Sequence, residues 1–250
     1  MKKNNKKISM ITAYDYTTAK IISDTNIDWV LVGDSAAMTM HGHNSTPEIS
    51  VDEMISHTKA VCKGISDKLI IGDIPLKAFN ENILEVVNRF IKAGANAVKL
   101  EGVDGFEDII KQIVDKDIKV MGHLGLTPQT IDISSGNVVQ ARDESSAEKL
   151  IADAKKLEQL GCFAIVLECI PAKLASQVSQ EINIPTIGIG AGIGCDGQVL
   201  VIQDMLGMND NKFKFVKKYL NGQKLISDAL NEFDKDVKEQ KFPTEENSFK

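Results

Sequence analysis

Short apolar runs recur along most of the chain, and each has Gly, Asp, Glu or His at or near its end. They are rich in Val and Ile and lack long polar alternation, which is typical of strands covered on both faces of a parallel sheet. The eight runs are Ile8–Asp15, Trp29–Asp34, Lys68–Ile74, Ala97–Gly102, Ile118–Gly125, Cys162–Cys169, Ile184–Gly192 and Gly197–Gly207.

Segments with apolar residues at helical spacing lie between many of these runs. Ser50 and Glu53 form the pattern of a capping box, and Gly94 and Gly161 stand where a left-handed residue ends a helix. The alternation of strands and helices predicts right-handed βαβ units and a parallel sheet. The predicted helices are Val51–Ile65, Ile83–Ala93, Phe106–Val114, Ala147–Leu160 and Leu174–Ile182.

Eight strands in about 200 residues favour a closed (β/α)₈ TIM barrel, with an open doubly wound sheet as the alternative. We expect residues 1–250 to form one α/β barrel domain. A helical extension should begin at about residue 209, because Phe213–Glu239 is amphipathic and a polar tail follows it. These additional C-terminal helices are expected to pack on the barrel or on a neighbouring subunit.

Charge and composition narrow the partners and the compartment. The net charge is −6 and no basic patch stands out, so we expect no nucleic-acid partner. The basic segment Met1–Lys7 has no apolar stretch after it, and no run reaches the roughly 18 apolar residues of a membrane helix. The four cysteines form no CxxC pair. We therefore expect a cytoplasmic protein with reduced cysteines and no membrane association.

Polar residues stand at the ends of several predicted strands. In a parallel barrel, the carboxyl ends of the strands and the loops after them carry the catalytic groups. An ionised group buried there is costly unless it is paired or binds a metal, so the repetition predicts a shared site. The residues are Asp34, Ser35, Asp73, Lys99, Glu101, His123 and Glu168.

Lys99 and Glu101 are two positions apart in one predicted strand, so their side chains should point the same way. Val98 and Leu100 would then face the surrounding helices. Taken alone, the pair could equally be a surface ion pair at a strand end.

The carboxylates of Asp34, Asp73 and Glu101 form an all-oxygen set. Hard cations such as Mg²⁺ take one or two carboxylates and complete their coordination with water or substrate oxygens. Carboxylates that share a site repel one another, and a divalent cation relieves that repulsion. The set therefore predicts a Mg²⁺ site, or one for another divalent cation.

The four histidines have different expected roles. His41 and His43 flank Gly42, and this HxH could suggest a metal pair, but we favour loop or substrate-gate residues. His57 falls in the middle of a predicted helix and is interpreted as structural. His123 is the histidine that we expect in the active site.

Several unusual strings occur in one order between Ile11 and about Gly207: ITAYDY, LVGDS, GD-x-P, VKLEG, GHLGLTPQ, VLEC-x-P and IGIGAG-x-x-CDGQ. In this order they resemble the ketopantoate hydroxymethyltransferase family. The resemblance implies a (β/α)₈ barrel that transfers a one-carbon unit from 5,10-methylenetetrahydrofolate to 3-methyl-2-oxobutanoate. The product, ketopantoate, serves pantothenate and coenzyme A biosynthesis. The resemblance also implies a large homo-oligomer, often a decamer.

The resemblance assigns roles to the strand-end residues. Asp34 and Asp73 would contact both the metal and the substrate, and Glu101 would be metal-associated. Ser35 and Lys99 would bind the substrate carboxylate.

The resemblance also implies that Glu168 is the proton acceptor and that His123 lies beside it among the catalytic groups. A cation that polarises the keto group of a 2-oxo acid acidifies the adjacent C3–H, which a carboxylate can then remove. The resulting enolate would attack the methylene carbon of the folate.

The sequence departs from the family pattern in the segment Ser134–Arg142 and at Asn247, where the family usually has His. The departures raise questions about loop shape and folate contacts. Two alternatives remain. One is a metal-dependent 2-oxo acid C–C lyase or mutase of a related barrel family, which would typically carry a reactive cysteine in a lid loop. The other is a non-catalytic barrel that binds a metabolite.

Overall fold

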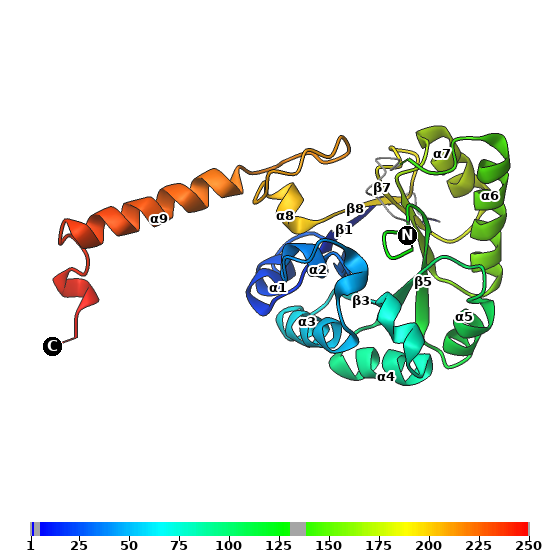
Figure 1. The fold of residues 1–250 in the computed structure, drawn as a ribbon, viewed down its shortest axis with the longest axis horizontal. Coiled ribbons are helices and arrows are strands. Elements are labelled where there is room, and N and C mark those ends of the chain that lie inside the picture. Colours follow the sequence, from blue (N-terminus) through cyan, green and yellow to red (C-terminus); the bar gives the residue numbers. More distant parts are fainter. Residues whose placement is uncertain (1, 3–5, 131–138, 250) are drawn as a thin grey trace. The chain divides into compact units, whose positions relative to one another are not determined.

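Eight parallel strands close into a barrel in the computed structural model, which describes residues 2, 6–130 and 139–249. The strands follow one another around the barrel in chain order, and the last pairs with the first (Figure 1). The predicted (β/α)₈ architecture is confirmed. The strands are β1 (Ile8–Thr12), β2 (Trp29–Val32), β3 (Leu69–Asp73), β4 (Ala97–Glu101), β5 (Lys119–Gly125), β6 (Ala164–Glu168), β7 (Thr186–Ile189) and β8 (Gly197–Leu200).

Helices lie around the outside of the barrel (Figure 1). At the start of α3, Ser50 and Glu53 make the predicted capping box, and Gly94 ends α4 with a φ of +112°. An additional helix, α1, begins at Tyr16, and the carboxylate of its N-cap residue, Asp15, accepts a hydrogen bond from Thr18 N at 2.8 Å. The helices that precede β8 in the chain are α1 (Tyr16–Ser23), α2 (Ala36–Thr39), α3 (Val51–Gly64), α4 (Ile83–Ala93), α5 (Glu107–Val114), α6 (Glu144–Gln159) and α7 (Ala172–Glu181).

Alternate residues of each strand fill the barrel. Ala97 belongs to the buried interior cluster, so Lys99 and Glu101 in the same strand point inward as predicted. In β3 the outward position is Gly72, where a Cβ would lie 2.4 Å from Cδ1 of Phe90 in α4. Because Gly72 faces α4 and successive side chains of a strand point to opposite faces, Asp73 points to the inner side. The interior cluster comprises Ile8, Met10, Trp29, Leu31, Ile71, Ala97, Met121, Ala164, Val166, Ile187 and Val199.

Residues Ile202–Lys250 form a second compact unit. It contains α8 (Ile202–Met205), α9 (Gly222–Lys238) and a short 3₁₀ helix, Glu245–Asn247. The expectation of one domain over residues 1–250 stays a prediction.

Two predicted boundaries near this unit were wrong. The strand expected over Gly197–Gly207 ends at Leu200 and α8 follows, while the helix expected over Phe213–Glu239 begins only at Gly222. Short apolar runs do not distinguish a strand from a helix. In the segment before Gly222, Tyr219 N and Gly222 N donate to the carbonyl oxygens of Met205 and Leu206, both at 2.8 Å, instead of to carbonyls four residues back in a helix.

Candidate active site

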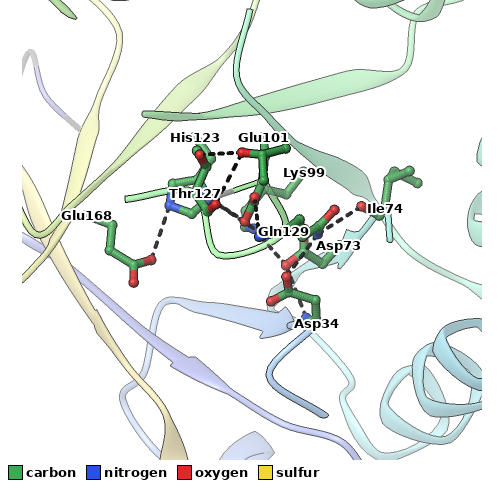
Figure 2. A network of polar contacts seen from close by, with 10 residues as sticks. Asp34, Asp73, Ile74, Lys99, Glu101, His123, Thr127, Gln129 and Glu168 are labelled. Carbon is green, nitrogen blue, oxygen red and sulfur yellow. Dashed lines mark hydrogen bonds and ion pairs between the residues drawn. The ribbon is translucent and has the colours of Figure 1, made fainter. Parts of the chain in front are cut away.

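The carboxyl ends of five neighbouring strands bring the predicted polar residues together (Figure 2). These ends are buried apart from Glu168, whose side chain is 18% exposed. Ser35 lies in the same turn as Asp34, but the hydroxyl of Ser35 pairs with Tyr14. Asp34 follows β2, Asp73 ends β3, Lys99 and Glu101 lie in β4, His123 lies in β5 and Glu168 ends β6.

Lys99 and Asp73 form a buried ion pair. Lys99 Nζ lies 2.7 Å from Asp73 Oδ2 and 3.9 Å from Glu101 Oε1. The backbone N–H of Asp34 donates to Asp73 Oδ2 at 3.1 Å. Burial is the main cause that raises the pKa of Asp73 to about 7; Lys99 opposes the rise, and Asp34 and Glu101 add to it.

The ammonium of Lys99 is the firmly charged member of this pair. Burial works to lower the pKa of Lys99, but Asp73, Asp34 and Glu101 together raise it well above the ordinary value. A permanent cation is thereby held at the mouth of the barrel, where it can attract a substrate anion.

His123 bridges two carboxylates. Its Nδ1 lies 3.1 Å from Glu101 Oε1, and its Nε2 lies 3.2 Å from Glu168 Oε2 without the alignment of a hydrogen bond. Burial and Lys99, whose Nζ is 3.4 Å from Nδ1, oppose protonation, yet Glu101 and Glu168 raise the pKa of His123 to about 9. His123 is therefore an imidazolium at neutral pH, and Glu101 is held ionised, with its pKa lowered by His123 and Lys99 against the effect of burial.

Gln129 is a site residue that the sequence reasoning missed. Its backbone N–H donates to Glu101 Oε2 at 3.0 Å, and its side-chain amide donates to Asp34 Oδ2 at 2.9 Å (Figure 2). It is 5% exposed, so these bonds are made in a dry environment. The signal was its place in GHLGLTPQ, a polar residue four positions beyond Gly125 at the end of β5.

Tyr14, which follows β1, is a second residue that was missed. Its hydroxyl lies 2.8 Å from Ser35 Oγ, and burial raises the pKa of Tyr14 to about 12. The phenol is neutral at neutral pH and fixes the Ser35 side chain.

The three predicted metal ligands differ in their freedom to bind a cation. Both oxygens of Glu101 already have partners, His123 and Gln129. Asp34 and Asp73 are adjacent, because the backbone N–H of Asp34 donates a hydrogen bond to the Asp73 carboxylate. Two direct carboxylates with water and substrate oxygens match the preference of Mg²⁺. Because the neighbouring carboxylates help to raise the pKa of Asp73, a cation there would relieve a real repulsion.

The cysteines do not provide a reactive thiol beside this site. Cys162 and Cys169 are buried, and burial raises the pKa of each to about 12. Burial also raises the pKa of the Cys62 and Cys195 thiols. Thiols that remain protonated are poor nucleophiles, which counts against the lyase alternative.

Two segments bear on the family departures noted in the sequence. Residues 134–138 of the segment Ser134–Arg142 lie outside the described residues. Asn247 accepts hydrogen bonds from Thr244 N and Thr244 Oγ1 at 3.3 and 2.8 Å, so it caps the short 3₁₀ helix.

Within the described residues, no helix is both long enough and apolar enough to cross a membrane.

Solved structures with similar folds belong to other enzymes. Phosphonopyruvate hydrolase matches with a TM-score of 0.64 at 12% identity over 99% of this chain and 88% of that chain. 2,3-Dimethylmalate lyase, a PEP mutase/isocitrate lyase superfamily member, matches with a TM-score of 0.63 at 14% identity over 94% and 86%. A structure of phosphonopyruvate hydrolase with oxalate and Mg²⁺ matches at 0.63, with 11% identity over 98% and 89%. At these identities the likeness concerns the fold alone.

Sequence comparisons are more specific. Residues 1–245 match the model of the ketopantoate hydroxymethyltransferase family. A 3-methyl-2-oxobutanoate hydroxymethyltransferase of Francisella tularensis subsp. novicida is 51% identical over 99% of this chain and 95% of its own length. The enzymes of the same name from Bdellovibrio bacteriovorus and Clostridium novyi are 48% and 49% identical, covering 99% and 100% of this chain and 96% and 92% of their own. The chain, with its barrel and its acidic strand ends, therefore belongs to the ketopantoate hydroxymethyltransferase family.

Proposed function

We propose that this protein transfers a hydroxymethyl group from 5,10-methylenetetrahydrofolate to 3-methyl-2-oxobutanoate, giving ketopantoate for pantothenate and coenzyme A biosynthesis. One observation carries the proposal: an unbroken chain of polar contacts runs from Asp34 to Glu168 across the barrel mouth (Figure 2). It combines a buried cation, a set of carboxylates and a partly exposed acid, which are the groups that enolisation of a 2-oxo acid requires.

Lys99 and Ser35 would bind the substrate carboxylate. The Lys99 ammonium is fixed by Asp73, and the Ser35 hydroxyl is fixed by Tyr14, so neither has to be ordered when the substrate arrives. The same ammonium would stabilise the negative charge of the enolate.

Glu168 would remove the proton from C3 of the oxo acid. Its carboxylate is the most accessible acid of the contact chain, with an 18% exposed side chain. His123 holds Glu168 Oε2 from one side, and its positive charge keeps that carboxylate oriented as an acceptor. Glu101 in turn holds the imidazolium, so His123 is a positioning and proton-holding group in this mechanism.

A divalent cation, Mg²⁺ in the first instance, would be held directly by Asp34 and Asp73, and by Glu101 through water. When bound, it supplies Lewis-acid polarisation of the keto oxygen. The hard oxygen donors and the mutual repulsion of the carboxylates support this assignment. Gln129 would keep Asp34 in place by its 2.9 Å hydrogen bond.

The proposed reaction forms one carbon–carbon bond and releases tetrahydrofolate. The C3–H bond breaks, its proton goes to Glu168, and the enolate forms a carbon–carbon bond to the methylene carbon. The two bonds from that carbon to the folate nitrogens break, and water supplies the hydroxyl group. One nitrogen takes the proton held by Glu168, the other takes the remaining proton of water, and tetrahydrofolate leaves.

Proton exchange tests the assignment of the base without the folate. We expect 3-methyl-2-oxobutanoate to exchange its C3 proton in deuterated water, with loss of exchange when a chelator is added. Glu168→Gln should slow the exchange by about 10²–10⁴-fold, the usual contribution of a general base. Glu181→Gln is the matched control, because that carboxylate is paired with Lys155 on the surface. Full exchange in Glu168→Gln would remove Glu168 as the base.

Product formation tests the overall reaction. Ketopantoate should appear from the oxo acid and methylenetetrahydrofolate, and disappear on chelation. Turnover of a C–C lyase substrate without C3 exchange would instead favour the related lyase families.

We propose that the protein forms a homo-oligomer; the family suggests a decamer. Four exposed apolar residues of α9 recur at helical spacing and share one face: Ile226, Leu230, Phe233 and Val237. A second copy of this chain is the partner that we assign to this face. Leu230→Asp should lower the mass measured by light scattering, whereas Asn231→Asp, away from the face, should leave it unchanged. An unaltered mass in Leu230→Asp would exclude this interface.

The cytoplasm is the proposed compartment. Cys62, Cys162, Cys169 and Cys195 are all free, which suits a reducing environment.

A further inference from the structure

Three histidines and a glutamate gather outside the active-site contact chain. His41 and His43 lie in the segment after α2, whereas Glu53 and His57 lie in α3. One ligand atom from each of His41, His43 and Glu53 lies within 4.8 Å of the other two. We propose that His41, His43 and Glu53 bind a divalent transition metal of the zinc class, at a site separate from the proposed Mg²⁺ ligands.

The hydrogen bonds fix which nitrogen of His41 can bind a metal. His57 Nδ1 must donate to the carbonyl oxygen of Tyr14, 2.6 Å away, so neutral His57 presents a lone pair at Nε2. His41 Nε2 is 2.8 Å from that atom and must be the donor. This leaves the lone pair of His41 on Nδ1, and Nδ1 faces Glu53 Oε1 at 3.6 Å.

The distance between these two atoms fits a shared cation. Two acceptors face each other at 3.6 Å, and that separation is too long for a hydrogen bond even if His41 were protonated. Ligands bound tetrahedrally to zinc, with bonds near 2.0–2.2 Å, stand about 3.4 Å apart. A metal between Nδ1 and Oε1 satisfies both atoms without a large movement.

Two of the three ligands are held from behind, as ligands of metal sites usually are. His41 donates its other ring N–H to His57. Glu53 Oε2 accepts hydrogen bonds from Ser50 N and Ser50 Oγ at 2.8 and 2.7 Å, which leaves Oε1 turned toward His41. The capping box explains the position of Oε2 but gives Oε1 no partner, whereas a metal does.

The ligand types select the metal. Two imidazoles and one carboxylate suit zinc and its neighbours, while Mg²⁺ prefers oxygen ligands. Three protein ligands leave a further position for water. His41 and its two partners are partly exposed, so a metal from solution can reach them. The proposal takes up the metal-pair alternative for the HxH sequence, whereas the sequence alone favoured loop or gate residues.

The proposed metal is connected to the substrate site by hydrogen bonds. His57 links His41 to the carbonyl of Tyr14, and the hydroxyl of Tyr14 bonds to Ser35. A bound ion would thus fix the segment after α2 relative to the residue that we assign to the substrate carboxylate.

Metal content tests the site without any assay of activity, so the result is independent of the proposed transferase reaction. The full-length protein is stripped of metal, loaded with Zn²⁺ in excess Mg²⁺, desalted and measured for zinc. Co²⁺ then serves as a spectroscopic probe. We expect retained zinc and a tetrahedral Co²⁺ absorption spectrum in the wild type.

The variants separate the two sites. His41→Ala, His43→Ala and Glu53→Gln should lose the retained zinc, and His57→Ala should weaken binding by about 10–100-fold. Asp52→Asn, the matched control, alters the neighbouring carboxylate of α3, which pairs with Arg89, and should keep the zinc. Asp34→Asn should also keep it. Circular dichroism checks folding, and Glu53→Gln retains an amide oxygen for the Ser50 cap.

Two results would overturn the proposal. One is a wild type that retains no zinc. The other is zinc that is lost in Asp34→Asn but kept in His43→Ala, which would place the ion among the active-site carboxylates.

Discussion

Gly125 ends strand β5 and lies beside the proposed base, Glu168, which ends strand β6. It is paired in register with Glu168 and has a φ of +96°. A Cβ at this position would lie 2.2 Å from the carbonyl oxygen of Glu168 and 2.7 Å from Cγ2 of Ile170. The first contact is with backbone, which cannot rotate away, so Gly125→Ala must displace the end of β6.

The size of the effect follows from two contributions. An alanine in the left-handed region costs roughly 1–2 kcal/mol, and overpacking of a filled site costs about 1–3 kcal/mol. Gly125→Ala should therefore destabilise the protein by about 2–5 kcal/mol. Gly105→Ala is the matched control, because Gly105 has a φ of +80° and no atom within 4 Å of its added Cβ. It should cost only the first contribution.

Urea unfolding measures the stability of both variants, and the C3-proton exchange assay measures the consequence for Glu168. We expect Gly125→Ala to lose stability beyond Gly105→Ala and to slow exchange, while Gly105→Ala exchanges at the wild-type rate. Equal losses of stability in the two variants would refute the close-contact reasoning. A normal exchange rate in a destabilised Gly125→Ala protein would show that the position of Glu168 does not set the rate.

Two further perturbations test the electrostatics of the site. Lys99→Met should destabilise the metal-free protein by about 3–5 kcal/mol in urea unfolding, because Asp73 is left buried without its counter-charge. Adding Asp73→Asn should restore part of the loss, and a purely additive double variant would contradict the pairing. Cys162 and Cys169, with pKa values of about 12, should have only about one thiolate in 10⁴ at pH 8, and their alkylation should accelerate as the pH rises. Rapid labelling of the native protein at pH 8, measured by mass spectrometry, would disprove that protection.

Apolar strand runs that alternate with helical spacing favoured the barrel over an open sheet, because both patterns are local properties of the chain. Lys99 and Glu101 were placed on the inner face for the same reason. The boundaries near Gly197–Gly207 and Phe213–Glu239 were wrong, since spacing does not reveal the backbone hydrogen bonds that Tyr219 and Gly222 make to Met205 and Leu206. Helix α1 was not predicted, although its N-cap residue, Asp15, is of a type that commonly begins helices.

The sequence by itself thus determined the fold class and the residues that stand at strand ends. Only the tertiary structure decided which of them touch. Closure of the barrel and its register place His123 opposite Glu101, and they bring Gly125 against Glu168. The loop after β5 carries Gln129 to Asp34, 95 residues away in sequence. Such contacts depend on how separate elements are brought together in space, and no spacing within a single element encodes that.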